Sequence, residues 1–228
     1  MAHVLAYSAR QHCPSWDIRV KLTPLVRLKS AMKRASHVHN TQKLDYWAAC
    51  VDQAADGTSM VLLDADTVIL RPLDDLWAQP FDLAYTVRAP GSFKYPINGG
   101  VICLHVNPGT RAFMAAWCQA NRRMLGDRDT HVPWRTKYGG INQASFGYAL
   151  EHDMARGLDV RELPCQEWNC EDSAWRTFSP ATRILHIKSS LRNAIFDRVV
   201  AHDYLRPLMK LWESIETASV SHPSLIAR

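Results

Sequence analysis

The chain has 228 residues, 47% of them hydrophobic and 21% charged, which fits one ordinary globular domain over residues 1–228. Its formal net charge is only +5 and no lysine and arginine run stands out, so we expect no nucleic-acid partner. The six cysteines form no Cys-x-x-Cys pair, no signal segment opens the chain, and no apolar run is long enough for a membrane span. These features predict a cytoplasmic protein without a transmembrane segment.

The first predicted elements are a helix over residues 2–12 and an alternating strand over 17–22. A second helix is expected to begin with Asn40 or Thr41 as its cap and to end before Gly57. Lys43 falls on its first turn. It is either a solvated lysine or a cation held near a phosphate at the end of the next strand.

The stretch from Ser59 to Trp77 reads SMVLLDADTVILRPLDDLW. An apolar strand over 60–63 ends in Asp64 and Asp66, a second apolar run follows at 67–70, and a helical turn follows at 73–77. Strand ends are where open α/β sheets bind ligands, and paired carboxylates suit Mg²⁺ or Mn²⁺. The alternative is a solvated strand end.

The next predicted strand covers 82–87 and leads into Arg88, and the loop 89–96 has the composition of a mobile flap. Ile97-Asn98-Gly99-Gly100 then precedes a buried strand over 101–106. The two glycines indicate either a backbone that passes close to a ligand or a tight turn that needs positive φ. Asn98 offers an amide to sugar hydroxyls.

A long helix is expected from Asn107 to about residue 125, followed by a polar loop over 126–138. That loop contains a second Asp-x-Asp pair, Asp127 and Asp129, which has no strand before it and is interpreted as solvated. Residues 139–143 (GGINQ) open a further helix to about residue 152, whose N-terminus would direct amide groups into the adjoining cleft.

The last predicted elements are strands over 159–163 and 183–187 and a helix over 201–218, with Trp168 and Asn169 in a loop. His186 closes the later strand, with Lys188 and Arg192 beyond it. A histidine in that place is usually a core residue, but the two cations make a metal and diphosphate role plausible.

Six motifs, in order, resemble the glycogenin-like family of retaining glycosyltransferases. They are KLDYW (43–47), LDADTVILRPLDDLW (63–77), PINGGV (96–101), GGINQ (139–143), LPCQEWN (163–169) and LHIKSSLR (185–192). The resemblance implies an α/β GT-A fold, with a Rossmann-like mixed central sheet flanked by helices and a smaller acceptor-side sheet. The first strand, which carries the nucleotide base in such folds, is not found in this sequence.

The resemblance also implies a set of site residues. Asp64, Asp66 and His186 would hold Mn²⁺ (or Mg²⁺) against the donor diphosphate, and Lys43, Lys188 and Arg192 would neutralise phosphate oxygens. Asn98, Gly99, Gly100, Asn142 and Gln143 would line the sugar pocket, and Arg88 is a further expected donor-binding residue. This chain departs from the family where Asn142 replaces an aspartate, Ser189 a glycine and Arg192 a lysine.

The predicted activity is transfer of a hexose from a nucleotide diphosphate sugar, UDP-linked, to an acceptor hydroxyl on a glycan, a lipid-linked glycan or a protein, with retention. No carboxylate stands out as a nucleophile on the sugar side, so we expect front-face attack, with Asn142 and Gln143 as catalytic residues that stabilise the cationic sugar. One alternative is a haloacid-dehalogenase-type phosphatase, since LLDADTV also resembles its nucleophile strand. Another is a relative that binds sugar or nucleotide without turnover.

Overall fold

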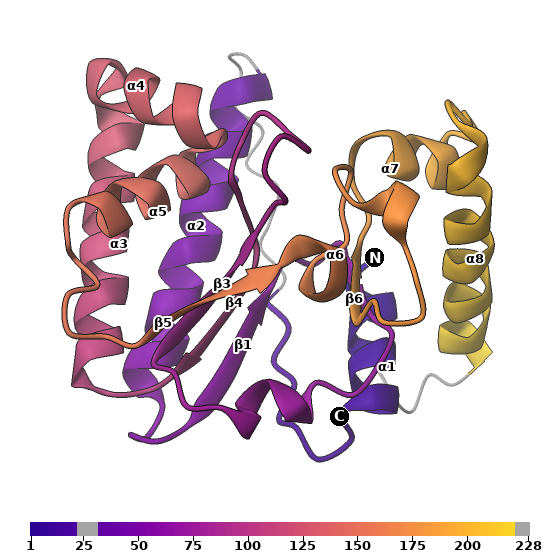
Figure 1. The fold of residues 1–228 in the computed structure, drawn as a ribbon, viewed down its shortest axis with the longest axis horizontal. Coiled ribbons are helices and arrows are strands. Elements are labelled where there is room, and N and C mark those ends of the chain that lie inside the picture. The colour runs from indigo at the N-terminus through magenta and orange to yellow at the C-terminus, as the bar shows by residue number, and fades with distance from the viewer. Residues whose placement is uncertain (22–31, 222–228) are drawn as a thin grey trace.

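A computed structural model describes residues 1–21 and 32–221 (Figure 1). Its helices of eight or more residues are α1 (Ala2–His12), α2 (Met32–Gln53), α3 (Pro108–Gly126), α4 (Arg128–Tyr138), α5 (Ile141–Glu151), α7 (Ser189–Phe196) and α8 (Arg206–Ser221). Shorter helical segments are η1 (Asp74–Ala78), α6 (Cys165–Trp168), η2 (Trp175–Thr177) and η3 (Asp203–Leu205). The strands are β1 (Ser59–Leu63), β2 (Thr67–Ile69), β3 (Leu83–Val87), β4 (Ile97–His105), β5 (Val160–Pro164) and β6 (Ile184–His186).

Four strands form the central sheet in the order β1-β4-β3-β5. β4 runs antiparallel to both of its neighbours, whereas β5 pairs with β3 in parallel. β2 and β6 form a separate antiparallel pair. In Figure 1, α2, α3, α4 and α5 lie to one side of the central sheet, and α1, α7 and α8 lie on the side of β6. The predicted mixed sheet flanked by helices is therefore confirmed.

The core follows from alternation along the strands, because successive side chains of a strand point to opposite faces. Ile102 and Leu104 of β4 pack with residues of α2, α3 and α5, including Trp117. Val101 and Cys103 of the same strand pack in a second cluster, which reaches β2, η1 and α1. A third cluster surrounds β6 and α8. The two faces of the central sheet are thus each covered by buried apolar side chains.

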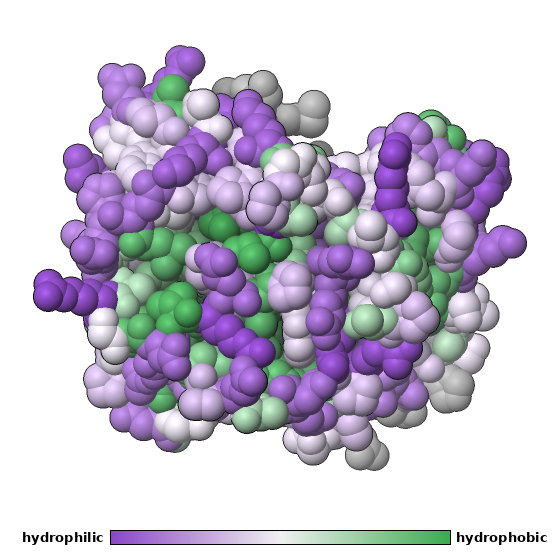
Figure 2. All heavy atoms as spheres, viewed as in Figure 1, coloured by the Kyte–Doolittle hydropathy of each residue, from purple (hydrophilic) through white to green (hydrophobic). Residues whose placement is uncertain are grey.

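The space-filling view of the same face is largely hydrophilic at its margins, with hydrophobic side chains gathered over α5 and β5 (Figure 2). All six cysteines are free thiols. Within residues 1–21 and 32–221, no helix combines the length and the apolar character that a membrane crossing requires.

Trp168, expected in a loop, is the last residue of the short helix α6, and three larger predicted elements also differ from the structure. Residues 17–21 are not a strand, and Leu22 lies outside the described residues. The apolar residue Ile18 of this segment packs against the hydrophobic cluster beside β1. The segment pairs with no strand among the described residues. α2 begins at Met32 rather than at Asn40, and the Thr41 hydroxyl bonds to the His37 carbonyl and to Asn121 instead of capping the helix.

The third difference is the predicted loop 126–138, most of which is helix α4. Asp127 caps this helix, because its side chain accepts a hydrogen bond of 2.9 Å from the Asp129 amide. The second Asp-x-Asp pair is therefore explained by a helix N-terminus. The sequence did not predict α4 because the segment is highly polar and has Pro133 inside the helix.

Candidate metal and donor site

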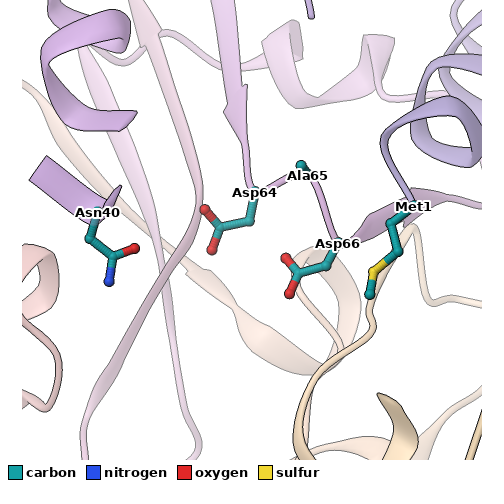
Figure 3. A pocket seen from close by; sticks show the side chains of 5 residues that line it. All are labelled: Met1, Asn40, Asp64, Ala65 and Asp66. Carbon is teal, nitrogen blue, oxygen red and sulfur yellow. The ribbon is translucent and has the colours of Figure 1, made fainter. Parts of the chain in front are cut away.

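The two acids of the Asp-x-Asp sequence lie in a tight connection between two sheets. The Asp64 amide donates to the Gly100 carbonyl at 2.9 Å, which extends the β1–β4 pairing by one residue. The Asp66 carbonyl accepts from the Ile187 amide at 2.7 Å, which ties it to the end of β6. Thr67 closes the turn, because its amide and hydroxyl both donate to the Asp64 carbonyl. Figure 3 shows the two carboxylates directed into the same space.

His186 brings an imidazole to these carboxylates from the second sheet. It pairs with Thr67 across the β2–β6 ladder and is 4% exposed. Its Nε2 lies 3.2 Å from Asp66 Oδ1 and 3.9 Å from Asp64 Oδ2. One ligand atom from each of the three residues lies within 4.8 Å of the others. Two carboxylates and one imidazole are suitable ligands for a divalent cation of the Mn²⁺ or Mg²⁺ class, so this donor set fits the predicted metal.

Two cations compensate the charge of the carboxylates. Lys43 forms an ion pair with Asp64, and Arg192 forms one with Asp66. Burial acts to raise the pKa of Asp66, but its hydrogen bond to His186 and the charges of His186 and Arg192 outweigh burial and lower the pKa to about 2. The Asp66 side chain is therefore an anion at neutral pH.

A pocket of about 310 Å³ opens beside the carboxylates. It is lined by Met1, Asn40, Asp64, Ala65 and Asp66. In Figure 3, Asn40 comes from α2 on one side of the two acids, and Met1 comes from the start of α1 on the other. The pocket therefore gives a ligand access to the Asp-Asp-His group from solvent.

Arg88 and Lys188, both predicted to bind the donor, are bonded to a different carboxylate. Arg88 donates through Nε and Nη2 to the two oxygens of Glu171, each at 2.9 Å. Lys188 Nζ lies 2.8 Å from Glu171 Oε2 and 3.2 Å from Asp172 Oδ1. Arg88 also donates to the carbonyls of Tyr95 and Ile97, so it fastens both this carboxylate and the loop 89–96.

The glycine pair lies inside β4, and neither glycine has positive φ, so the tight-turn interpretation is wrong. A Cβ on Gly100 would lie 2.6 Å from His186 Cε1, closer than real Cβ contacts. The close approach expected from the sequence is therefore made to the His186 ring. Asn98 is 3% exposed, and its side chain is occupied by protein hydrogen bonds.

Asn142 and Gln143 lie in the first turn of α5, but their side chains have different surroundings. Asn142 Nδ2 donates to the Asn40 carbonyl at 2.8 Å, and its Oδ1 accepts from Asn121 at 2.9 Å. Gln143 donates to the carbonyls of Ile97 and Tyr138 and accepts a long bond of 3.4 Å from the Gly99 amide. Gln143 thus adjoins the glycine pair, whereas Asn142 joins three helices.

The sequence interpretation did not identify Glu171, and it used Asn169 only as part of a motif. Both side chains are completely buried in the polar cluster behind His186. The signal available in the sequence is the set of polar residues Asn169, Glu171 and Asp172, which follows the strand predicted over 159–163. Their partners come from β3, β4 and β6 and from the residues just after β3 and β6, so the sequence order alone does not reveal the cluster.

A central mixed sheet flanked by helices, with an Asp-Asp-His group between it and the two-stranded sheet, is consistent with a fold of the GT-A glycosyltransferase type. No family model matches the chain, and no curated protein matches it. Among solved structures, the chain is similar to the crystal structure of a glycosyltransferase involved in the glycosylation of the major capsid of PBCV-1. The TM-score is 0.57 at 15% identity, and the match covers 83% of this chain and 87% of that one. This likeness concerns the fold.

Proposed function

We propose that this protein is a metal-dependent glycosyltransferase that moves a hexose from a nucleotide diphosphate sugar to an acceptor hydroxyl with retention. The observation that carries the proposal is the convergence of Asp64, Asp66 and His186 from two sheets, with their ligand atoms within 4.8 Å. The similar glycosyltransferase of known structure supports the class of reaction. UDP is the nucleotide that the glycogenin-like motifs favour.

Some residues of the site would act on the diphosphate of the donor and others on its sugar. A divalent ion on Asp64, Asp66 and His186 would supply charge stabilisation to the departing diphosphate. Lys43 and Arg192, which pair with the metal ligands here, would shift to phosphate oxygens when the donor binds. Lys188 lies two residues after His186, the last residue of β6, and is a further cation for the donor.

On the sugar side, Gln143 and the Gly99 backbone are the groups that we assign to the hexose. Asn98 and Gly100 shape the adjoining wall, Arg88 holds the loop 89–96, and Asn142 positions the start of α5. We propose front-face attack by the acceptor hydroxyl, because Glu171, the buried acid near this wall, is already bonded to Arg88 and Lys188. Covalent labelling of a carboxylate by a slow donor analogue would contradict that mechanism.

The decisive experiment is a thermal-shift panel of nucleotide sugars with and without Mn²⁺. At least one donor should stabilise the wild-type protein, and it should do so only in the presence of Mn²⁺. The free energy of unfolding should rise by about 2.7 kcal/mol at a donor concentration 100 times Kd. Asp66→Ala should abolish this stabilisation. Asp129→Ala is the matched control, since it alters the exposed Asp-x-Asp pair of α4 and should leave the response intact. Indifference of the wild type to every donor would refute the proposal.

Two further readouts separate the alternatives. The phosphatase alternative requires an acidic pair at a strand end after a late lysine, but Asp197 is the C-cap of α7 and Asp203 begins η3. It predicts release of phosphate from p-nitrophenyl phosphate, lost in Asp64→Asn. A binding protein without turnover predicts donor stabilisation but no Mn²⁺-dependent hydrolysis or transfer of the sugar.

A further inference from the structure

Both ring nitrogens of His186 have polar partners. Its Nε2 faces the two aspartates, while its Nδ1 lies 3.0 Å from Asn169 Oδ1. The backbone of Gly100 lies against the ring, so the ring has little room to rotate. Whether Nδ1 carries a hydrogen therefore depends on whether Asn169 presents its oxygen or its amide nitrogen.

The orientation of the neighbouring Asn98 is fixed by two groups that have only one hydrogen-bonding role. The Gly100 amide can only donate, and it donates to Asn98 Oδ1 at 2.9 Å. The Glu171 carboxylate, ion-paired with Arg88 and Lys188, can only accept, and it accepts from Asn98 Nδ2 at 3.3 Å. Exchanging the oxygen and nitrogen of the Asn98 amide would break both contacts.

The orientation of Asn98 in turn fixes that of Asn169. Asn169 Nδ2 lies 3.1 Å from Asn98 Oδ1, which can only accept. It also lies 2.9 Å from Thr86 Oγ1, whose single hydrogen is given to the Asn98 carbonyl at 2.7 Å. Both neighbours require a donor, so the amide nitrogen of Asn169 faces them. Its oxygen therefore faces His186 Nδ1.

We propose that Asn169 is a positioning residue that accepts a hydrogen bond from His186 Nδ1–H and so directs Nε2, which bonds to Asp66 in this structure, into the space between Asp64 and Asp66. Asn98 and Glu171 determine this arrangement from the far side of the cluster. The metal role of His186 rests on the proposed function, but the choice of nitrogen follows from the hydrogen bonds of this chain alone. A hydrogen bond behind a ligating imidazole fixes its orientation and its basicity.

The first test needs no metal and no substrate. Long-range ¹H–¹⁵N correlation spectra of the full chain report whether each ring nitrogen is protonated. His186→Gln identifies the signal. We expect Nδ1 to be protonated in the wild type, whether or not Nε2 carries a hydrogen that bonds to Asp66. A wild-type signal with Nδ1 unprotonated would overturn the proposal whatever the variants do.

The second test uses variants of Asn169. Asn169→Leu removes the acceptor, so we expect the hydrogen to move from Nδ1 to Nε2, which faces Asp66, and the Mn²⁺ affinity to fall by about 10- to 100-fold by titration. Asn169→Asp loses the bonds that Nδ2 donates to Asn98 and Thr86 but retains an acceptor for Nδ1, so the hydrogen should stay on Nδ1. An unchanged tautomer in Asn169→Leu would show that Asn169 does not position the ring.

Asn121→Ala is the matched control for a merely structural loss. Asn121 is equally buried and bonds to Thr41, Asn142 and Ser145, away from His186. It should lower stability without moving the His186 tautomer or the Mn²⁺ affinity. If wild-type protein has the expected tautomer but no affinity for Mn²⁺, the proposed function fails and the role of Asn169 stands.

Discussion

At the scale of single residues, the ion pairs of this protein fall into two kinds that differ in burial. The Arg88–Glu171 side chains are 2% and 0% exposed, whereas those of Lys43 and Asp64 are each 24% exposed. A buried pair is strongly destabilised when one partner is lost, because the other charge remains without compensation. A partly exposed pair can exchange its partner at small cost. We therefore assign a structural role to the first pair and a ligand-responsive role to the second.

Replacing Glu171 tests the structural role. Glu171→Leu should lower the free energy of unfolding by about 3–5 kcal/mol, because the Arg88 guanidinium is left buried and unpaired. Arg88→Met combined with Glu171→Leu should recover a large part of this loss. Asp45→Ala, which breaks the exposed Arg122–Asp45 pair, should cost less than about 1 kcal/mol. Urea unfolding measures all four proteins, and an equally stable Glu171→Leu protein would contradict the assignment.

The same substitution has a consequence for pH dependence. Burial acts to raise the pKa of Glu171, but the hydrogen bond and charge of Arg88, with the charge of Lys188, place it well below the usual range. A folded-state pKa below the unfolded value stabilises the protein above about pH 4.3, and this stabilisation is lost as the pH falls. The difference in stability between wild type and Glu171→Leu should therefore shrink on acidification.

At the scale of elements, the sequence was informative wherever local chemistry decides the structure. The apolar run before Asp64 and the Asn107-Pro108 step each predicted an element that the structure contains. The predicted strand is absent over its described residues 17–21 because a strand needs a partner, and alternation does not supply one. α4 was missed because its helix signal is a side-chain cap at Asp127 rather than an apolar face.

The N-terminus of α3 offers a quantitative test at this scale. Asn107 accepts from the Thr110 amide at 2.9 Å, and its Nδ2 donates to Asp82 Oδ1 at 2.7 Å. Asn107→Ala loses both bonds and should lower the free energy of unfolding by about 1–2 kcal/mol in urea denaturation. Asn107→Ser keeps a capping oxygen but does not reach Asp82, so its free energy of unfolding should lie between those of the wild type and Asn107→Ala. A serine variant as unstable as the alanine variant would show that the cap contributes little.

At the scale of the whole molecule, the Asp-Asp-His group joins two separate sheets. Asp64 extends the edge strand β1 of the central sheet, whereas His186 closes β6 of the two-stranded sheet. The sequence pointed to these three side chains because each follows or closes an apolar strand, and the resemblance implied that they lie together. The sequence could not predict that Arg88 and Lys188 share Glu171, since tertiary packing brings these three residues of separate segments together.

This arrangement predicts that a divalent ion stabilises both sheets together. Local unfolding that separates β1 from β6 would break the site. Amide hydrogens that exchange through such unfolding should therefore exchange up to about 100-fold more slowly when Mn²⁺ is present at 100 times its Kd. The amides to follow are Asp64, bonded to Gly100, and Ile187, bonded to Asp66. Amides of α4 serve as an internal control, and His186→Ala should remove the effect. Protection confined to one sheet would mean that the ion is held by the aspartates without the imidazole.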